Sequence, residues 1–138
     1  MPRGHTAYSE RPLIDNLGIK PHTDIAIFNA PKKVDAAFGQ LPAGVTRRAS
    51  LRGPLDFIHF FTASRQALQR KFAALKAALA KDGTLWISWP KTTSGVRTDL
   101  NENIVREIGL GNGLVDVKVC AVDEVWSGLK FVYRLSER

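Results

Sequence analysis

The sequence has one cysteine, Cys120, and no apolar run of the length that crosses a bilayer. One cysteine excludes an internal disulfide and a cysteine-rich zinc site, and a membrane-spanning helix would need about 20 apolar residues in succession. The N-terminal segment MPRGHTAYSERP has no apolar stretch behind its charges, so it does not match a secretory signal. We therefore expect a cytoplasmic protein with no membrane partner.

The sequence is also poor in recognisable catalytic and metal-binding patterns. His5, His22 and His59 are scattered, and no pair of them has metal-ligand spacing. His59 lies within an apolar segment, where a hydrogen-bonded core histidine is expected. Cys120 has two interpretations, a reactive thiol beside Lys118 or a small buried core residue. The sequence predicts no metal site. It does not identify a catalytic residue, and it leaves open whether the protein is an enzyme.

Positive charge is what the sequence has in excess, with 20 Lys+Arg against 13 Asp+Glu and a formal net charge of +7. Such a charge attracts nucleic acids and anionic ligands. However, the sequence lacks the interleaved aromatic residues of a single-strand binder and the spacing of known DNA-binding motifs. A basic nucleic-acid-associated protein is therefore an alternative and not the main interpretation.

The chain of 138 residues suits one domain, which we place at 9–138 after a flexible N-terminal segment at 1–8. Strand-like and helix-like segments alternate along it. Strands are expected at 24–31, 44–51, 55–61, 84–89, 115–122 and 126–135, and helices at 9–21, 34–41, 64–80 and 99–110.

This alternation predicts an α/β fold, a three-layer Rossmann-like sandwich with a mostly parallel sheet. The continuous apolar segments 55–61 and 84–89 are typical of strands buried on both faces. The short turn 123–125 joins the last two strands into a C-terminal antiparallel hairpin.

Polar residues at the helix boundaries predict where the helices begin and end. Ser9 and Ser64 are placed to cap helix N-termini, and Gly18 is placed to end the first helix. Asp99 and Glu102 have the spacing of a capping box, which predicts a helix beginning at Asp99.

Several stretches resemble the class I methyltransferase fold, namely LGIKPHTDIAIFNA, LDFIHFF, ALKAALAKDGTLWISW and the terminal hairpin. Nearly the whole chain is also similar to a family of small bacterial proteins of unassigned function. The stretches that carry this second resemblance are WPKTTSGVRTDL and LNENIVREIGLGNGLVDVKVCAVDEVWSGLKFV. It implies no activity and no catalytic residue.

The methyltransferase resemblance implies a glycine-rich turn after the first strand, which holds S-adenosylmethionine, and an acid after the second strand, which binds the ribose hydroxyls. Here the first turn, 29–33, contains no glycine, and Pro31 removes a backbone donor. The second strand offers Arg47, Arg48 and Ser50 in place of the acid. We therefore predict no cofactor, and a divergent S-adenosylmethionine-dependent methyltransferase remains an alternative.

Polar loops at 29–33, 62–65 and 89–99 follow predicted parallel strands, and the carboxyl ends of such strands meet at one edge of the sheet. Two of these loops lead into helix N-termini, which suit anions. The main interpretation is therefore a module that binds a small anionic ligand or a protein partner; the other is a set of solvated loops with ordinary helix caps. The predicted ligand-binding rim consists of Asn29, Lys32, Ser64, Arg65, Trp89, Lys91, Thr93, Ser94, Arg97 and Thr98.

Overall fold

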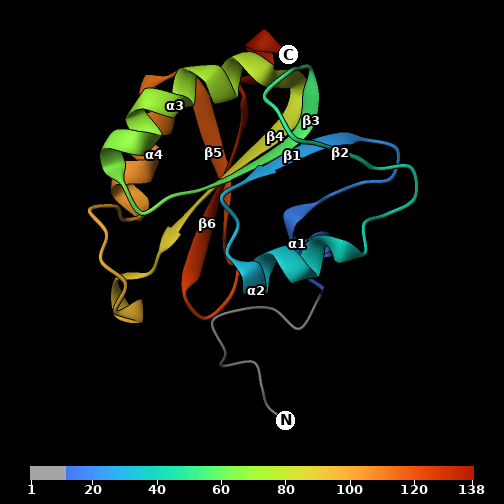
Figure 1. The fold of residues 1–138 in the computed structure, drawn as a ribbon. Coiled ribbons are helices and arrows are strands. Elements are labelled where there is room, and N and C mark those ends of the chain that lie inside the picture. The colour runs from blue at the N-terminus through green and yellow to red at the C-terminus, as the bar shows by residue number, and fades with distance from the viewer. Residues whose placement is uncertain (1–11) are drawn as a thin grey trace.

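The computed structural model describes residues 12–138 and has a six-stranded sheet with helices on both faces (Figure 1). The strand order is β2-β1-β3-β4-β6-β5. Neighbouring strands from β2 to β4 are parallel, and β6 is antiparallel to both β4 and β5. The predicted three-layer sandwich with its closing hairpin is thus confirmed. The strands are β1 (Asp24–Phe28), β2 (Thr46–Arg48), β3 (Leu55–Phe61), β4 (Leu79–Pro90), β5 (Leu114–Ala121) and β6 (Trp126–Tyr133).

Helices α3 and α4 cover one face of the sheet, and the short helices α1 and α2 cover the other (Figure 1). None of the helices in residues 12–138 is long and apolar enough to span a bilayer. The helices are α1 (Leu13–Leu17), α2 (Lys32–Asp35), α3 (Arg65–Ala78) and α4 (Glu102–Gly111), with 3-10 turns η1 (Ala36–Gly39), η2 (Thr92–Ser94) and η3 (Leu135–Glu137).

Helix α3 packs on the sheet through an apolar stripe with helical spacing. Leu68, Phe72 and Leu75 recur every three or four residues and are completely buried. Phe72 meets Phe131 of β6 edge to face, with the ring centroids 5.8 Å apart. Burial of each such side chain contributes about 1.5–3 kcal/mol to folding, so this stripe fixes α3 over the centre of the sheet.

Helix α4 lies close against β6 because Gly109 faces the ring of Phe131. A Cβ atom at Gly109 would overlap that ring, and Gly109 itself is buried. The glycine therefore sets the distance between α4 and the sheet.

Some predicted boundaries of the helices and strands are confirmed, and others are wrong. Gly18 ends α1 in the left-handed conformation with φ +81°, as predicted, whereas Ser9 lies outside the described residues. The last helix begins at Glu102 and not at Asp99, because the side chain of Asn101 caps it by accepting the Ile104 N–H at 2.9 Å.

Strand β4 begins at Leu79, five residues before the predicted start, and takes over the last residues expected in the preceding helix. Leu79 already pairs with Leu55, whereas the regular register resumes only where Phe57 pairs with Thr84. Residues 80–83 therefore lie opposite the single residue Asp56 and form a bulge that no local periodicity indicates.

Candidate functional site

The strand order reverses beside β1. The chain passes from β1 to β2 on one side and then returns to place β3 on the other side of β1. In open α/β sheets, ligands bind outside the carboxyl ends of the strands at such a reversal. The relevant ends here are Phe28 of β1 and Phe61 of β3.

The turn after β1 has an unusual backbone. Asn29 adopts the left-handed conformation with φ +63°, which asparagine tolerates better than most residues. Its amide nitrogen Nδ2 donates a hydrogen bond of 3.2 Å to the carbonyl of Phe61. The turn is thus tied to the end of β3, and the chain changes direction without a glycine.

A hollow of about 330 Å³ lies at this reversal, on the face of the sheet that carries α3. Phe28 and Phe60 are register partners on adjacent parallel strands, so their side chains lie next to each other on that face. The connection from β2 to β3 contains no helix, which leaves this part of the face uncovered. The hollow is lined by Phe28, Asn29, Phe60, Ala67, Arg70 and Lys71.

Arg70 and Lys71 give the hollow its charge. Both side chains are exposed at the second turn of α3, and among residues 12–138 neither forms an ion pair with a carboxylate. No acidic residue lines the hollow. It therefore combines an apolar floor with two cationic groups that are available to an anion.

The N-termini of α3 and α4 are occupied by the protein's own side chains. Ser64 Oγ accepts the Ala67 N–H at 3.1 Å, and Asp99 Oδ1 accepts the Arg65 N–H at 2.7 Å. Asp99 was expected to cap the helix that follows it, but its carboxylate instead caps α3. The carboxylate of Asp99 thus lies at the positive end of the α3 helix dipole, within the protein itself.

The two loops at this edge are also joined through Thr98. Its Oγ1 donates to the carbonyl of Ala63 at 2.7 Å and accepts the Leu100 N–H at 3.1 Å. Of these two predicted rim residues, Ser64 caps α3 and Thr98 ties its loop to Ala63, the residue before Ser64.

The structure gives the other predicted rim residues different surroundings. Trp89 is 3% exposed and belongs to the core under α3 and α4. Thr93 and Ser94 form the 3-10 turn η2, where Ser94 Oγ accepts the Val96 N–H. Of the predicted rim, only Asn29 lines the hollow at the strand reversal. The residues that do not line it are Lys32, Ser64, Arg65, Trp89, Lys91, Thr93, Ser94, Arg97 and Thr98.

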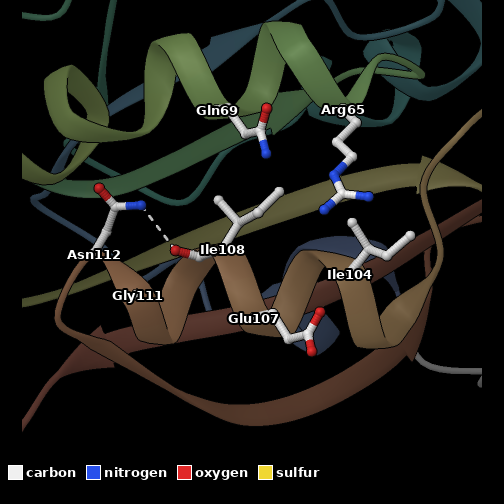
Figure 2. A pocket seen from close by; sticks show the side chains of 7 residues that line it. All are labelled: Arg65, Gln69, Ile104, Glu107, Ile108, Gly111 and Asn112. Carbon is white, nitrogen blue, oxygen red and sulfur yellow. Dashed lines mark hydrogen bonds between the residues drawn. The ribbon is translucent and has the colours of Figure 1, made fainter.

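Arg65 lines a second hollow, of about 340 Å³, in the groove between α3 and α4. Figure 2 shows Arg65 and Gln69 extending from α3 toward α4, with Ile104 and Ile108 rising from α4 to meet them. Because this groove also carries the acidic Glu107, its charge is mixed. We therefore regard the hollow at the strand reversal as the better candidate for an anionic ligand.

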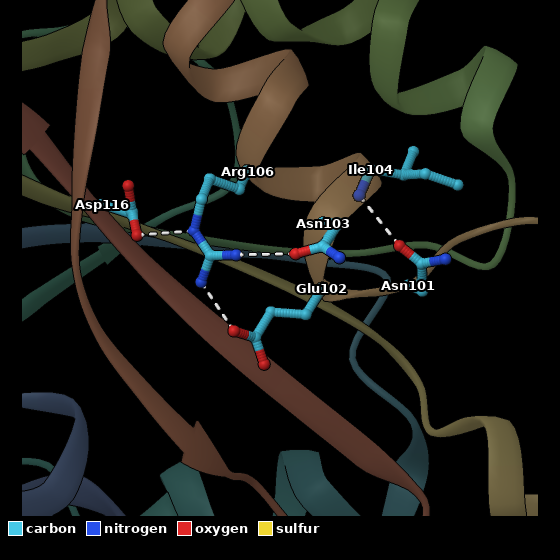
Figure 3. A network of polar contacts seen from close by, with 6 residues as sticks. All are labelled: Asn101, Glu102, Asn103, Ile104, Arg106 and Asp116. Carbon is cyan, nitrogen blue, oxygen red and sulfur yellow. Dashed lines mark hydrogen bonds and ion pairs between the residues drawn. The ribbon is translucent and has the colours of Figure 1, made fainter.

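Arg106 forms a polar network that has a structural role. Its guanidinium donates to Asp116 at 2.8 Å, Glu102 at 2.6 Å and Asn103 at 3.1 Å (Figure 3). The hydrogen bonds to Asp116 and then Glu102 raise the pKa of the guanidinium. Each nitrogen atom of the guanidinium thus has a partner within the protein. Because Arg106 lies on α4 and Asp116 on β5, their bond holds α4 against β5.

The titratable groups buried in the sheet lie in apolar surroundings. His59 is completely buried with Nε2 2.7 Å from Ser88 Oγ, and burial lowers its pKa to about 3. Cys120 packs at the edge of the core under α1, where burial raises the pKa of the thiol against the opposing effect of Lys118. In residues 12–138 no three His, Cys, Asp or Glu side chains are grouped to hold a metal ion.

Sequence reasoning missed the residues that define the hollow, namely Phe28, Phe60, Arg70 and Lys71. Arg70 and Lys71 fall within the expected helix 64–80, and Phe28 and Phe60 within the expected strands 24–31 and 55–61, and the sequence pattern predicts no ligand contact for any of them. The signal that was available is the absence of helical periodicity between the second and third strands, in residues 49–54, which leaves the adjacent face of β1 uncovered.

No protein-family model matches the chain, and no curated protein matches it. Solved structures of methyltransferases have a similar fold. Magnesium protoporphyrin IX methyltransferase from Synechocystis with bound SAH is 13% identical with a TM-score of 0.59, over 88% of this chain and 78% of that one. The precorrin-6y C5,15-methyltransferase from Geobacter metallireducens is 9% identical with a TM-score of 0.60, over 93% and 94%. A TehB-like SAM-dependent methyltransferase from Corynebacterium glutamicum is 15% identical with a TM-score of 0.53, over 95% and 90%.

At these identities the likeness concerns the fold. The chain has a class I methyltransferase-like Rossmann fold, as the sequence resemblance implied.

Proposed function

Starting from a methyltransferase-like fold with a basic hollow at its strand reversal, we propose that this domain binds a small anionic ligand with a flat or apolar portion. The ligand would lie over the carboxyl ends of β1 and β3. The observation that carries the proposal is the pair Arg70 and Lys71, which lacks carboxylate partners and stands beside the rings of Phe28 and Phe60.

The hollow offers two kinds of contact to such a ligand, one charged and one apolar. A guanidinium and an ammonium group form charge-assisted hydrogen bonds with phosphate or carboxylate oxygens. The edges and faces of Phe28 and Phe60 offer apolar contact to a ring or a short carbon chain. Asn29, whose amide donates a hydrogen bond to the carbonyl of Phe61, adds a further polar group to the lining of the hollow.

The charge of the hollow does not fit S-adenosylmethionine, the group that the fold implies. Its sulfonium carries a positive charge, whereas the charged lining residues are Arg70 and Lys71. The segment after β2, residues 49–54, contains no carboxylate to take the ribose hydroxyls. We therefore derive no methyl-transfer step for this chain.

One observation supports a second candidate, a divergent S-adenosylmethionine-binding domain. The left-handed backbone of Asn29 turns the chain after β1 in a conformation that glycine would favour. Structures of similar fold hold SAM or SAH. This candidate places the ligand over the same turn, so the same binding experiment tests both.

Isothermal titration calorimetry with AMP, ribose 5-phosphate, inorganic phosphate, S-adenosylmethionine and S-adenosylhomocysteine separates these candidates. The proposal predicts that AMP binds more tightly than phosphate alone, because only AMP also contacts the two phenylalanines. It also predicts that Arg70→Ala with Lys71→Ala weakens AMP binding at least tenfold. Lys81→Ala with Arg134→Ala removes the same charge at the opposite edge of the sheet, near the start of β4 and the end of β6, and should leave AMP binding unchanged.

Tight binding of S-adenosylmethionine, with AMP inactive, would replace the anionic-ligand proposal by the second candidate. If both double variants weaken AMP binding to the same extent, AMP binding depends only on the net charge of the protein. In that case the nucleic-acid alternative gains support, and its test is a gel-shift series in which affinity falls steeply with salt. If no probe binds, the hollow is not a site for this class of ligand.

A further inference from the structure

Three lysines gather on the opposite face of the sheet from the hollow, around the end of α1. Lys118 of β5 and Lys130 of β6 are register partners, so their side chains emerge side by side. Lys130 is also the register partner of Trp86, whose ring lies in the core under α1. Lys20 follows α1 in the loop that leads to β1.

The end of α1 is held in place by bonds from the sheet, which fixes the positions of these lysines. Lys118 Nζ donates to the carbonyl of Asn16 at 3.0 Å, and Trp86 Nε1 donates to the carbonyl of Leu17 at 2.9 Å. Lys130 Nζ lies 4.0 Å from the point where a side chain at Gly18 would begin. Because Gly18 has no side chain, the ammonium group of Lys130 is left open on that side.

The three ammonium groups are not neutralised within the described part of the chain. None of Lys20, Lys118 and Lys130 forms an ion pair there. Burial lowers the pKa of Lys130, and the charges of Lys118 and then Lys20 lower it further. Like charges directly opposite each other on paired strands are destabilising, so this arrangement costs stability unless an anion offsets it.

A cavity of about 190 Å³ adjoins this lysine cluster and shares Gly18 and Lys20 with it. Thr23 and Thr84 contribute hydroxyl groups to its walls, and Phe57 forms an apolar part of the lining. The remaining lining residues are Asp56 and Asp82. Asp56 already accepts the Asp24 N–H at 2.9 Å.

We infer that Lys20, Lys118 and Lys130 form a binding site for the oxyanion of a small ligand, a carboxylate or a phosphate monoester, whose remainder occupies the adjoining cavity. The two aspartates in the cavity repel further negative charge. They select a ligand that is anionic at one end only and disfavour an extended polyanion. This site is separate from the hollow over β1 and β3, and it does not depend on the function proposed for that hollow.

NMR titration of the isotope-labelled protein tests this site, with inorganic phosphate and acetate as probes and sodium chloride at equal ionic strength as reference. We expect saturable shifts at Gly18, Lys118 and Lys130 with phosphate or acetate that chloride does not reproduce. Lys118→Met with Lys130→Met should weaken that binding at least tenfold, whereas Lys130→Arg, which retains the charge, should preserve it.

The matched control is Arg70→Ala with Lys71→Ala, which removes two charges from the other face and should leave the shifts at the lysine cluster intact. Shifts that do not saturate, or an unchanged dissociation constant in the double methionine variant, would overturn the inference. Affinity that rises with chain length in a polyphosphate series would overturn the small-ligand assignment. If the double methionine variant does not fold, loss of binding in Lys20→Met, which alters an exposed side chain, decides the question.

Discussion

Acidification should destabilise this protein through the single residue His59, well above the pH at which most carboxylates titrate. Its ring is completely buried and stacks on Phe61 with the ring centroids 4.1 Å apart. Nε2 is hydrogen bonded to Ser88 Oγ at 2.7 Å, whereas Nδ1 has no partner. A proton added to this ring would place an uncompensated charge in the core.

The direction of the pH effect on stability follows from the protonation of His59 in the folded and the unfolded protein. Burial lowers the pKa of His59 to about 3 in the folded protein, from 6.5 in an exposed histidine. Between these values the unfolded chain binds a proton that the native state does not bind, so stability falls as the pH drops below 6.5. Each pH unit costs about 1.4 kcal/mol, which makes the loss at pH 5 about 2 kcal/mol. That is a large share of the ~5–15 kcal/mol typical of a small domain.

Urea unfolding at pH 7 and pH 5 measures this loss directly. His59→Gln removes the titrating ring while keeping a group that can hydrogen bond to Ser88, so its stability should change little between the two pH values. His22→Asn removes an exposed histidine with φ +60° and should retain the pH dependence of the parent protein. If the His59→Gln protein loses as much stability as the parent, His59 is not the source of the effect.

Three further changes test other parts of the structure. Gly109→Ala should lower the free energy of unfolding by about 1–3 kcal/mol, because its new methyl group overlaps Phe131. Gly111→Ala, with no neighbour within 4 Å, should be neutral or gain up to about 1 kcal/mol from helix propensity; equal losses would contradict the packing argument. Asp99→Ala should cost about 0.5–2 kcal/mol in urea unfolding by removing the cap of α3, and a neutral result would refute that role. Lys91→Ala with Arg97→Ala should leave both the fold and AMP binding intact, as seen by thermal shift; loss of binding would place the ligand at the 89–99 loop.

At the carboxyl edge of the sheet, a residue whose sequence pattern predicts a cap for one helix caps a different helix. The segment 99–102 has the residues of a capping box, and the sequence pattern assigned Asp99 to the helix that follows. In the structure Asn101 takes that role, and Asp99 reaches 34 residues back along the chain to the N–H of Arg65. Helix N-termini have free donors wherever they lie, so the nearest acceptor in space caps them, and sequence order does not identify it.

Short-range sequence patterns were enough to predict the elements whose signals are local. The apolar segments 55–61 and 84–89, the hairpin around 123–125 and the cap at Ser64 were all read from short-range patterns, since strand burial, turn geometry and capping depend on neighbouring residues. The α/β layering followed from their alternation.

Long-range packing determines which side chains lie close together. Phe28 and Phe60 meet because β1 and β3 pair in a particular register, although β2 lies between them in the chain. Lys20, Lys118 and Lys130 meet because β5 and β6 pair beneath the end of α1. Register and long-range packing depend on the whole core, and a shift of one residue would turn each of these side chains to the other face. For that reason neither candidate site could be located from the order of residues alone.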